Sequence, residues 1–199
     1  VVAFLTSSFT LDATGSKVRE EIAKKAKFLG AVRLPDTAFS STGTDVVTDM
    51  IFLQKREQKL DHIDLSQPEF SWVCTNDQYL RNYAVDEDNE KAYQNVRVNN
   101  YFIEHPEQVI GTQYAKSTAY GFKACNSIID DFDSYYRDGM DRHFNFDSTF
   151  TNALDAALNN ITTSQSLEYH PVNQSNVITE RKDVNTNVLG AEFVNARPF

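Results

Sequence analysis

The stretch AVRLPDTAFSSTGTDVVTDMIFLQKR, residues 31–56, carries the side chains best suited to chemistry. Two apolar runs, Ala31–Leu34 and Val46–Leu53, flank a polar loop in which Phe39 stands alone among hydroxyl residues. An aromatic ring surrounded by hydroxyl groups can hold a flat ligand through stacking and hydrogen bonds. Phe39 can equally pack the loop back onto the strands, so a ligand contact and a packing role both stay open.

Known catalytic and metal-binding patterns are absent from the sequence. The 7 glycines form neither GxG nor GxxxxGK, so no phosphate-binding loop is predicted. The 2 cysteines, Cys74 and Cys125, lack CxxC spacing, and the 4 histidines are scattered. We therefore assign no catalytic residue and no metal ligand, and two reduced thiols favour a cytoplasmic protein.

Charge is distributed unevenly along the chain, whose formal net charge is -9. Residues 1–60 hold 9 Lys and Arg against 7 Asp and Glu (net +2), whereas residues 61–199 hold 10 against 21 (net -11). A polyanion would be repelled by the second part, so nucleic-acid contacts are expected mainly in the first sixty residues. No apolar run is long enough to cross a bilayer, and no membrane association is expected.

The elements that position the loop read as an α/β unit. Residues 1–8 form a short apolar run typical of a buried strand. Ser16 predicts the start of a helix over residues 16–29 with Gly30 as its stop, and an apolar stripe marks its buried face: Val18, Ile22, Ala26 and Leu29. Residues 31–34 and 46–53 read as strands, and a helical crossover makes the first two strands parallel.

The signal weakens after Arg56. We interpret residues 57–97 as a linker and residues 98–161 as an accessory, mainly helical region. A short helix is expected over Asn99–His105 with Pro106 interrupting it, and a stripe of Phe150, Leu154, Leu158 and Ile161 predicts a later helix. Residues 162–199, rich in Asn, Ser and Thr, read as an irregular tail.

Four segments resemble the carboxyl-terminal half of the catalytic domain of adenine-N6 DNA methyltransferases. These segments are VVAFLTSSFTLD, KVREEIAKKAKFLG, the pair AVRLPDTAF with GTDVVTDMIFLQKR, and VNNYFIEHPEQVIG. The first three are shared in looser form with the modification subunits of type I restriction systems. The fourth, residues 98–111, resembles large mobile-element proteins in which the methylase is fused to a helicase.

The resemblance implies a partial Rossmann-like methyltransferase sheet: residues 1–56 would supply its last three strands and one helix. Ligands of such sheets bind beyond the carboxyl ends of the parallel strands. The residues that the resemblance places near the substrate base are Thr6, Ser8, Arg33, Phe39 and Thr44. We also expect Asp49, inside an apolar strand, to have a charged or hydrogen-bonding partner, because a buried unpaired carboxylate is costly.

Two features of the family lack a counterpart here. The Asn/Asp-Pro-Pro-aromatic tetrapeptide that holds the target amine is missing, and so is the glycine-rich S-adenosylmethionine loop. Because the chain opens without Met in an apolar run, we interpret it as the interior of a larger protein with both features upstream. The expected partners are that upstream segment, a fused helicase and duplex DNA.

The predicted function is therefore that of a fragment of an S-adenosylmethionine-dependent DNA methyltransferase, inactive alone. The alternative is a non-catalytic interaction or scaffold module of a mobile-element protein that keeps the methylase fold.

Overall fold

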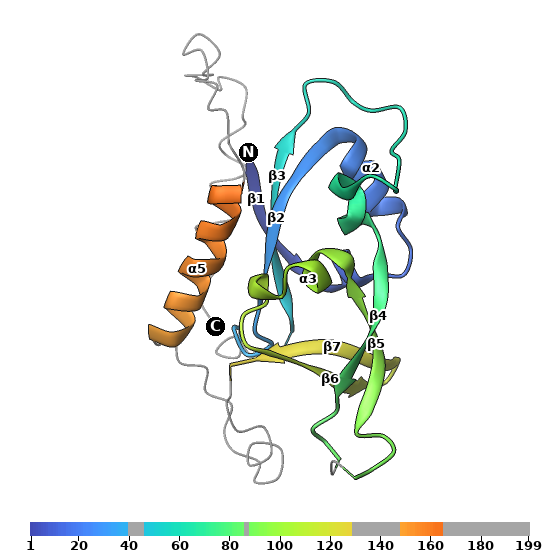
Figure 1. The fold of residues 1–199 in the computed structure, drawn as a ribbon, viewed down its shortest axis with the longest axis vertical. Helices are drawn as coiled ribbons and strands as arrows, with labels where there is room; N and C mark the ends of the chain where they lie inside the picture. Colours follow the sequence, from blue (N-terminus) through green and yellow to red (C-terminus); the bar gives the residue numbers. More distant parts are fainter. Residues whose placement is uncertain (40–45, 86–87, 129–147, 165–199) are drawn as a thin grey trace, which may run out of the picture. The chain divides into compact units, whose positions relative to one another are not determined.

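The computed structural model describes residues 1–39, 46–85, 88–128 and 148–164 (Figure 1). Val1–Ser166 forms one compact unit. Its helices are α1 (Phe9–Asp12), α2 (Lys17–Lys25), η2 (Pro68–Val73), α3 (Asn100–Glu104), η3 (Pro106–Gln108) and α5 (Ser148–Ser164). Its strands are β1 (Val2–Ser7), β2 (Ala26–Leu34), β3 (Thr48–Lys55), β4 (Thr75–Arg81), β5 (Tyr93–Asn99), β6 (Thr112–Thr118) and β7 (Gly121–Ser127). The expected mixture of helices and strands is confirmed.

The first sheet has the strand order β1-β3-β2, and β3 is antiparallel to both neighbours. β1 and β2 therefore run in the same direction, as the helical crossover predicts, but β3 lies between them. The strands expected over residues 31–34 and 46–53 are both present, and they pair antiparallel as β2 and β3. The remaining described strands form two hairpins, β4 with β5 and β6 with β7.

The predicted helix over residues 16–29 ends early, at Lys25. The next nine residues form β2, so Ala26 and Leu29 lie in a strand rather than on a helical stripe. Pairing with β3 outweighs the helical preference of Ala26, Lys27 and Leu29. Val18 is 65% exposed, and the buried side of α2 carries Arg19 and Ala23 instead.

Gly30 lies inside β2, at a register shift between Phe28 and Gly30, and does not end a helix. Its φ of 150° is one that other residues rarely adopt. A Cβ here would come within 2.8 Å of Tyr101 Oη and 2.9 Å of Ile161 Cγ1. The glycine lets the strand pass close to α3 and α5.

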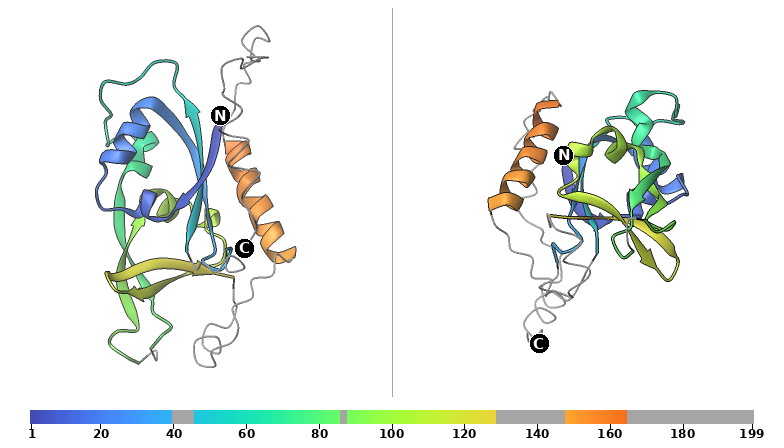
Figure 2. Two further views of the ribbon diagram at one scale, coloured as in Figure 1. Left: turned by 180° about the vertical axis from the view of Figure 1, so that it is seen from behind. Right: turned by 60° about the horizontal axis from the view of Figure 1, so that its bottom comes forward.

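The first sheet has α5 on one side and η2, α3 and the two hairpins on the other (Figure 2). An apolar cluster lies on each side of it. One joins Ala31 and Ile51 to η2, the hairpins and α3, through residues such as Trp72, Val98 and Phe102. The other joins Val32 and Leu34 to α5, whose Phe150 and Ile161 are buried. The predicted apolar stripe of the later helix, residues 150–161, is thus confirmed as packing surface.

Residues 57–97, expected as a linker, are only partly irregular. Residues 57–67 contain no helix or strand, but η2 buries Phe70, Trp72 and Val73, and β4 pairs with β5. The 3-10 helix η2 begins at Pro68, a residue that is favoured in the first turn of a helix. The hairpin was missed because its outward side chains are polar or aromatic and its apolar alternation is short.

Residues 98–161 are less helical than expected. The short helix before Pro106 is confirmed as α3, and η3 begins at Pro106. Between η3 and α5, however, the chain forms the β6–β7 hairpin, with Tyr114 and Cys125 paired and buried. Most of the irregular tail expected over 162–199 lies outside the described residues, although α5 continues to Ser164.

Candidate functional site

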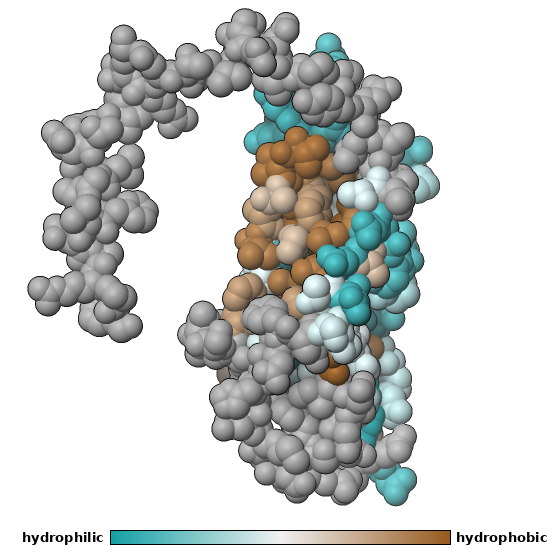
Figure 3. Space-filling view, turned by 90° about the vertical axis from the view of Figure 1, so that its left-hand side faces the viewer, coloured by the Kyte–Doolittle hydropathy of each residue, from teal (hydrophilic) through white to brown (hydrophobic). Residues whose placement is uncertain are grey.

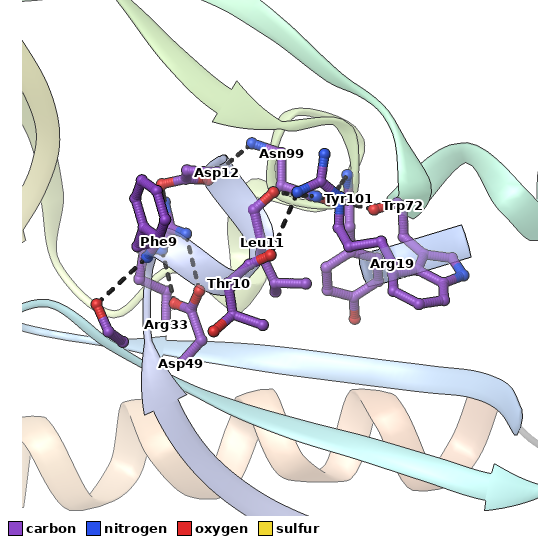
Figure 4. A network of polar contacts seen from close by, with 11 residues as sticks. Phe9, Thr10, Leu11, Asp12, Arg19, Arg33, Asp49, Trp72, Asn99 and Tyr101 are labelled. Atoms are coloured by element: carbon purple, nitrogen blue, oxygen red, sulfur yellow. Dashed lines mark hydrogen bonds and ion pairs between the residues drawn. The ribbon is translucent and has the colours of Figure 1, made fainter. Parts of the chain in front are cut away.

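The carboxyl ends of β1 and β2 lie at the same end of the first sheet, because Ser7 and Leu34 both pair with Thr48. One residue pair earlier, Thr6 and Arg33 lie on either side of Asp49. Within this row, the ion pair of Arg33 with Asp49 forms the centre of a polar network (Figure 4). The network brings together residues from β1, α1, β2, β3 and α3.

Arg33 holds the network together although its side chain is fully buried. Its Nε and Nη2 donate to Asp49 Oδ1 and Oδ2 at 2.8 and 2.9 Å, and its Nη1 lies 2.9 Å from Asp12 Oδ2. The guanidinium carbon lies 4.2 Å from the centroid of the Phe102 ring. Burial alone would lower the pKa of Arg33, because it disfavours the charged form. The nearby charges of Asp49 and Asp12 outweigh this effect, so the pKa of Arg33 is raised. The expected partner of Asp49 is therefore confirmed.

Asn99 connects the network to the neighbouring loops. Its backbone N–H donates to Asp12 Oδ1 at 2.9 Å, and its Nδ2 donates to the carbonyls of Leu11 and Trp72, each at 2.8 Å. Its Oδ1 accepts from the Tyr101 N–H at 3.0 Å and caps α3. One buried amide side chain thus fixes α1, η2 and α3 together.

Arg19 makes a second buried link, from α2 to η2. Its Nε donates to the Val73 carbonyl at 2.8 Å and its Nη1 to the Thr10 carbonyl at 3.2 Å. Burial lowers the pKa of Arg19, partly offset by the charge of Asp12. A buried charge that bonds mainly to carbonyl oxygens points to a structural role.

Of the residues expected near a substrate, Arg33 must be reassigned. Its guanidinium is inside the core, shared between two carboxylates and an aromatic ring, and so it does not reach the surface. The resemblance placed Arg33 near the substrate base because it lies close to the carboxyl end of the expected strand 31–34. The charge of Asp49, on the neighbouring strand, draws Arg33 inward instead.

Thr6 and Ser8 lie at the predicted end of the sheet. Thr6 Oγ1 is 2.6 Å from Thr10 Oγ1, and both side chains are partly buried. The Ser8 N–H donates to the Val47 carbonyl at 3.0 Å, which ties the end of β1 to the start of β3. Both residues are therefore close to the network, and their role toward a substrate stays a prediction.

Phe39 is partly buried and packs against the cluster under α5, which includes Leu34, Ala38 and Phe150. This is the contact expected if Phe39 packs the loop back onto the sheet. Nearby, Asp36 accepts from Tyr114 Oη at 2.7 Å and from Lys116 Nζ at 3.3 Å, which fixes the start of the loop. Thr44 lies outside the described residues.

Phe9 is an aromatic residue at this end of the sheet that sequence reasoning missed. It is 75% exposed and opens α1, directly after the polar end of β1. Its backbone N–H donates to Ser7 Oγ at 3.4 Å. The signal in the sequence is the Phe of TSSFT, which comes immediately after the apolar run of β1.

The segment 98–111 lines a cleft of about 310 Å³ between α3, η3 and α5. Its lining includes Leu29, Tyr101, His105, Glu107, Gln108, Asn160 and Ile161. His105 Nδ1 lies 3.1 Å from Glu107 Oε1, and burial raises the pKa of Tyr101 to about 12. The cleft combines aromatic and amide groups but contains no glycine turn for a phosphate or a nucleotide.

The described residues do not fit S-adenosylmethionine. Their glycines, at positions 15, 30, 111 and 121, are isolated from one another and form no ligand-binding turn. No group of three or more His, Cys, Asp or Glu in the described segments is arranged to hold a metal ion. Among the helices described, none has the length and apolar character needed to cross a bilayer.

Comparison of the chain with protein-family models, with curated proteins and with solved structures gives no match.

Proposed function

We propose that this chain supplies the carboxyl-terminal strands of an adenine-N6 DNA methyltransferase, whose cofactor loop and amine-holding tetrapeptide come from an upstream segment. In the assembled enzyme, a methyl group would pass from the sulfonium of S-adenosylmethionine to adenine N6, which loses a proton. The present chain would contribute walls and support to the site. It would supply no cofactor site, in agreement with the poor fit described above.

The observation that carries the proposal is the unfinished edge of the first sheet. In the described residues β1 pairs with β3 only, so its other edge presents unpaired backbone groups. Exposed apolar side chains follow the same strand: Val2 is 57%, Phe4 38% and Leu5 54% exposed. Figure 3 shows a continuous apolar area on the side of the molecule along which β1 and α5 run. Such an edge is suited to pairing with a further strand.

The direction of the strands supports the same proposal. β1 and β2 run parallel to one another and present their carboxyl ends at one end of the sheet, where ligands of open α/β sheets bind. Thr6, Ser8 and the exposed ring of Phe9 lie at that end. A flipped base needs an aromatic or apolar wall of this kind together with hydrogen-bonding groups.

Calorimetric titration with S-adenosylmethionine tests whether the upstream segment, and not this chain, supplies the cofactor site. We expect no binding by the 199-residue chain alone and micromolar binding once the upstream segment of its parent is joined to it. Binding by the chain alone would mean that residues assigned here to the core form the cofactor site. A joined protein that fails to bind would favour the second candidate, a scaffold module, for which the packed apolar cluster on one side of the sheet would suffice.

A further inference from the structure

The tip of the β6–β7 hairpin presents an aromatic surface that the core does not use. Tyr120 is 102% exposed, and Phe122, two residues later, is 36% exposed. A Cβ built on the adjoining Gly121 would meet nothing within 4 Å, so there is open space next to Tyr120 at this position. Single exposed aromatics are common, and an interaction site therefore needs further support.

The turn holds its shape through local hydrogen bonds. Thr118 Oγ1 accepts from the Tyr120 N–H at 3.2 Å and donates to the Gly121 carbonyl at 2.7 Å. Gly121 has a φ of 109°, a value that favours glycine. The backbone that carries Tyr120 is thus fixed before any ligand arrives, which lowers the entropy cost of binding.

The charge of the hairpin indicates the kind of partner. Residues 112–127 contain two lysines and no acidic residue, a net charge of +2 in a chain of net charge -9. Lys116 and Lys123 are paired across the two strands. Lys116 contacts Asp36 at 3.3 Å, whereas Lys123 is exposed. Lys123 lies three residues after Tyr120, so the end of the hairpin offers an exposed cation and an exposed ring within a short stretch of chain. This combination suits a ligand that carries both phosphates and flat bases.

We propose that the tip of the β6–β7 hairpin binds single-stranded DNA, with Tyr120 stacking on an unpaired base and Lys123 facing a phosphate. The proposal rests on the proposed function, because a methyltransferase that takes a base out of the duplex works on DNA with unpaired bases. Phe122 extends the aromatic surface along β7. The acidic remainder of the chain keeps the binding weak and dependent on salt.

Fluorescence anisotropy of a labelled oligothymidylate, titrated at low salt with the 199-residue chain, tests this. Such an oligonucleotide contains no adenine and needs no cofactor, so the result is independent of methyl transfer. We expect Tyr120→Ala to weaken binding roughly 5- to 100-fold, the range that loss of one aromatic stack produces. Lys123→Gln is expected to reduce the salt slope by about 0.7, the contribution of one phosphate contact on a single strand.

Tyr79→Ala is the matched control. Tyr79 is 65% exposed on β4, but the connection between β4 and β5 (residues 82–92) holds four acidic residues and one lysine. This substitution should leave binding unchanged, and circular dichroism should show all three variants folded. Equal affinity of wild type and Tyr120→Ala would overturn the proposal, as would equal losses in Tyr120→Ala and Tyr79→Ala or no binding by the wild type.

Discussion

The guanidinium of Arg33 lies over the ring of Phe102, with 4.2 Å between the guanidinium carbon and the ring centroid. This contact joins the strand β2 to the helix α3, two elements far apart in the sequence. The backbone reinforces it, since the Ile110 N–H donates to the Arg33 carbonyl at 3.0 Å and Arg33 forms a parallel bridge with Val109. Segments 1–56 and 98–111, which share the resemblance, therefore belong to one core.

The ion pair between Arg33 and Asp49 should be essential for stability. Both side chains are fully buried, so Asp49→Ala leaves a buried cation with Asp12 as its one carboxylate partner among the described residues. Loss of one member of a buried pair typically costs about 3–5 kcal/mol. We expect urea denaturation to show a loss of this size.

Asp77→Ala provides the comparison, because Asp77 pairs with Arg97 at 3.1 Å while 57% exposed. An exposed pair contributes about 0–1 kcal/mol. Equal effects of the two substitutions would mean that the Arg33 network adds little to folding.

The close approach at Gly30 predicts a steric effect. Gly30→Ala puts a Cβ within 2.8 Å of Tyr101 Oη and 2.9 Å of Ile161 Cγ1, on a backbone that disfavours it. Overpacking of this kind costs about 1–3 kcal/mol. We expect Gly30→Ala to lower the melting temperature. Gly15→Ala should leave it unchanged, because nothing lies within 4 Å of the new Cβ. A neutral Gly30→Ala would show that α5 does not pack against β2 as described.

Tyr101 should make stability fall at alkaline pH. Burial raises the pKa of its phenol from 10.0 to about 12, so the folded state favours the neutral form. As the pH rises, the Tyr101 phenol therefore ionises in the unfolded chain before it ionises in the folded one. Its contribution to the free energy of unfolding is complete below pH 10 and is lost as the pH rises toward 12. Urea midpoints of wild type should decline over this window more steeply than those of Tyr101→Phe. Parallel declines would rule out a contribution from Tyr101.

Phe9 and Phe39 can be separated by their effects on the joined enzyme. Phe9 is 75% exposed at the sheet end, whereas Phe39 packs in the α5 cluster. We expect Phe9→Ala to slow DNA methylation with cofactor affinity and melting temperature nearly unchanged. The main effect of Phe39→Ala should be a lower melting temperature. The opposite pattern would restore Phe39 as the base-facing residue.

Prediction from sequence succeeded where one local pattern determined the structure. The stripe of α5 and the proline at position 106 each marked an element that the structure confirms. The apolar run of residues 1–8 marked the strand β1 correctly, but its predicted burial is wrong, because most side chains of β1 are exposed. The position of Asp49 inside an apolar strand also correctly predicted a partner for its carboxylate, because a buried unpaired charge is costly.

It failed where distant contacts decide the local structure. The four residues after Lys25 follow the helix period, yet pairing with β3 converts Ala26–Leu34 into a strand. Arg33 appears at a loop boundary in the sequence, and only the fold shows that Asp12, Asp49 and Phe102 surround it. Both hairpins have short, partly polar strands with little periodicity, so residues 75–99 and 112–127 gave no clear signal.

The most direct test of the central claim is a methyl-transfer assay with S-adenosylmethionine labelled in its methyl group. The 199-residue chain, alone and joined to the upstream segment of its parent, is incubated with adenine-containing duplex DNA, and the labelled base is identified after hydrolysis. The account predicts labelled N6-methyladenine with the joined protein and no transfer with the chain alone. Transfer by the chain alone, or no N6-methyladenine from a joined protein that binds the cofactor, would contradict it.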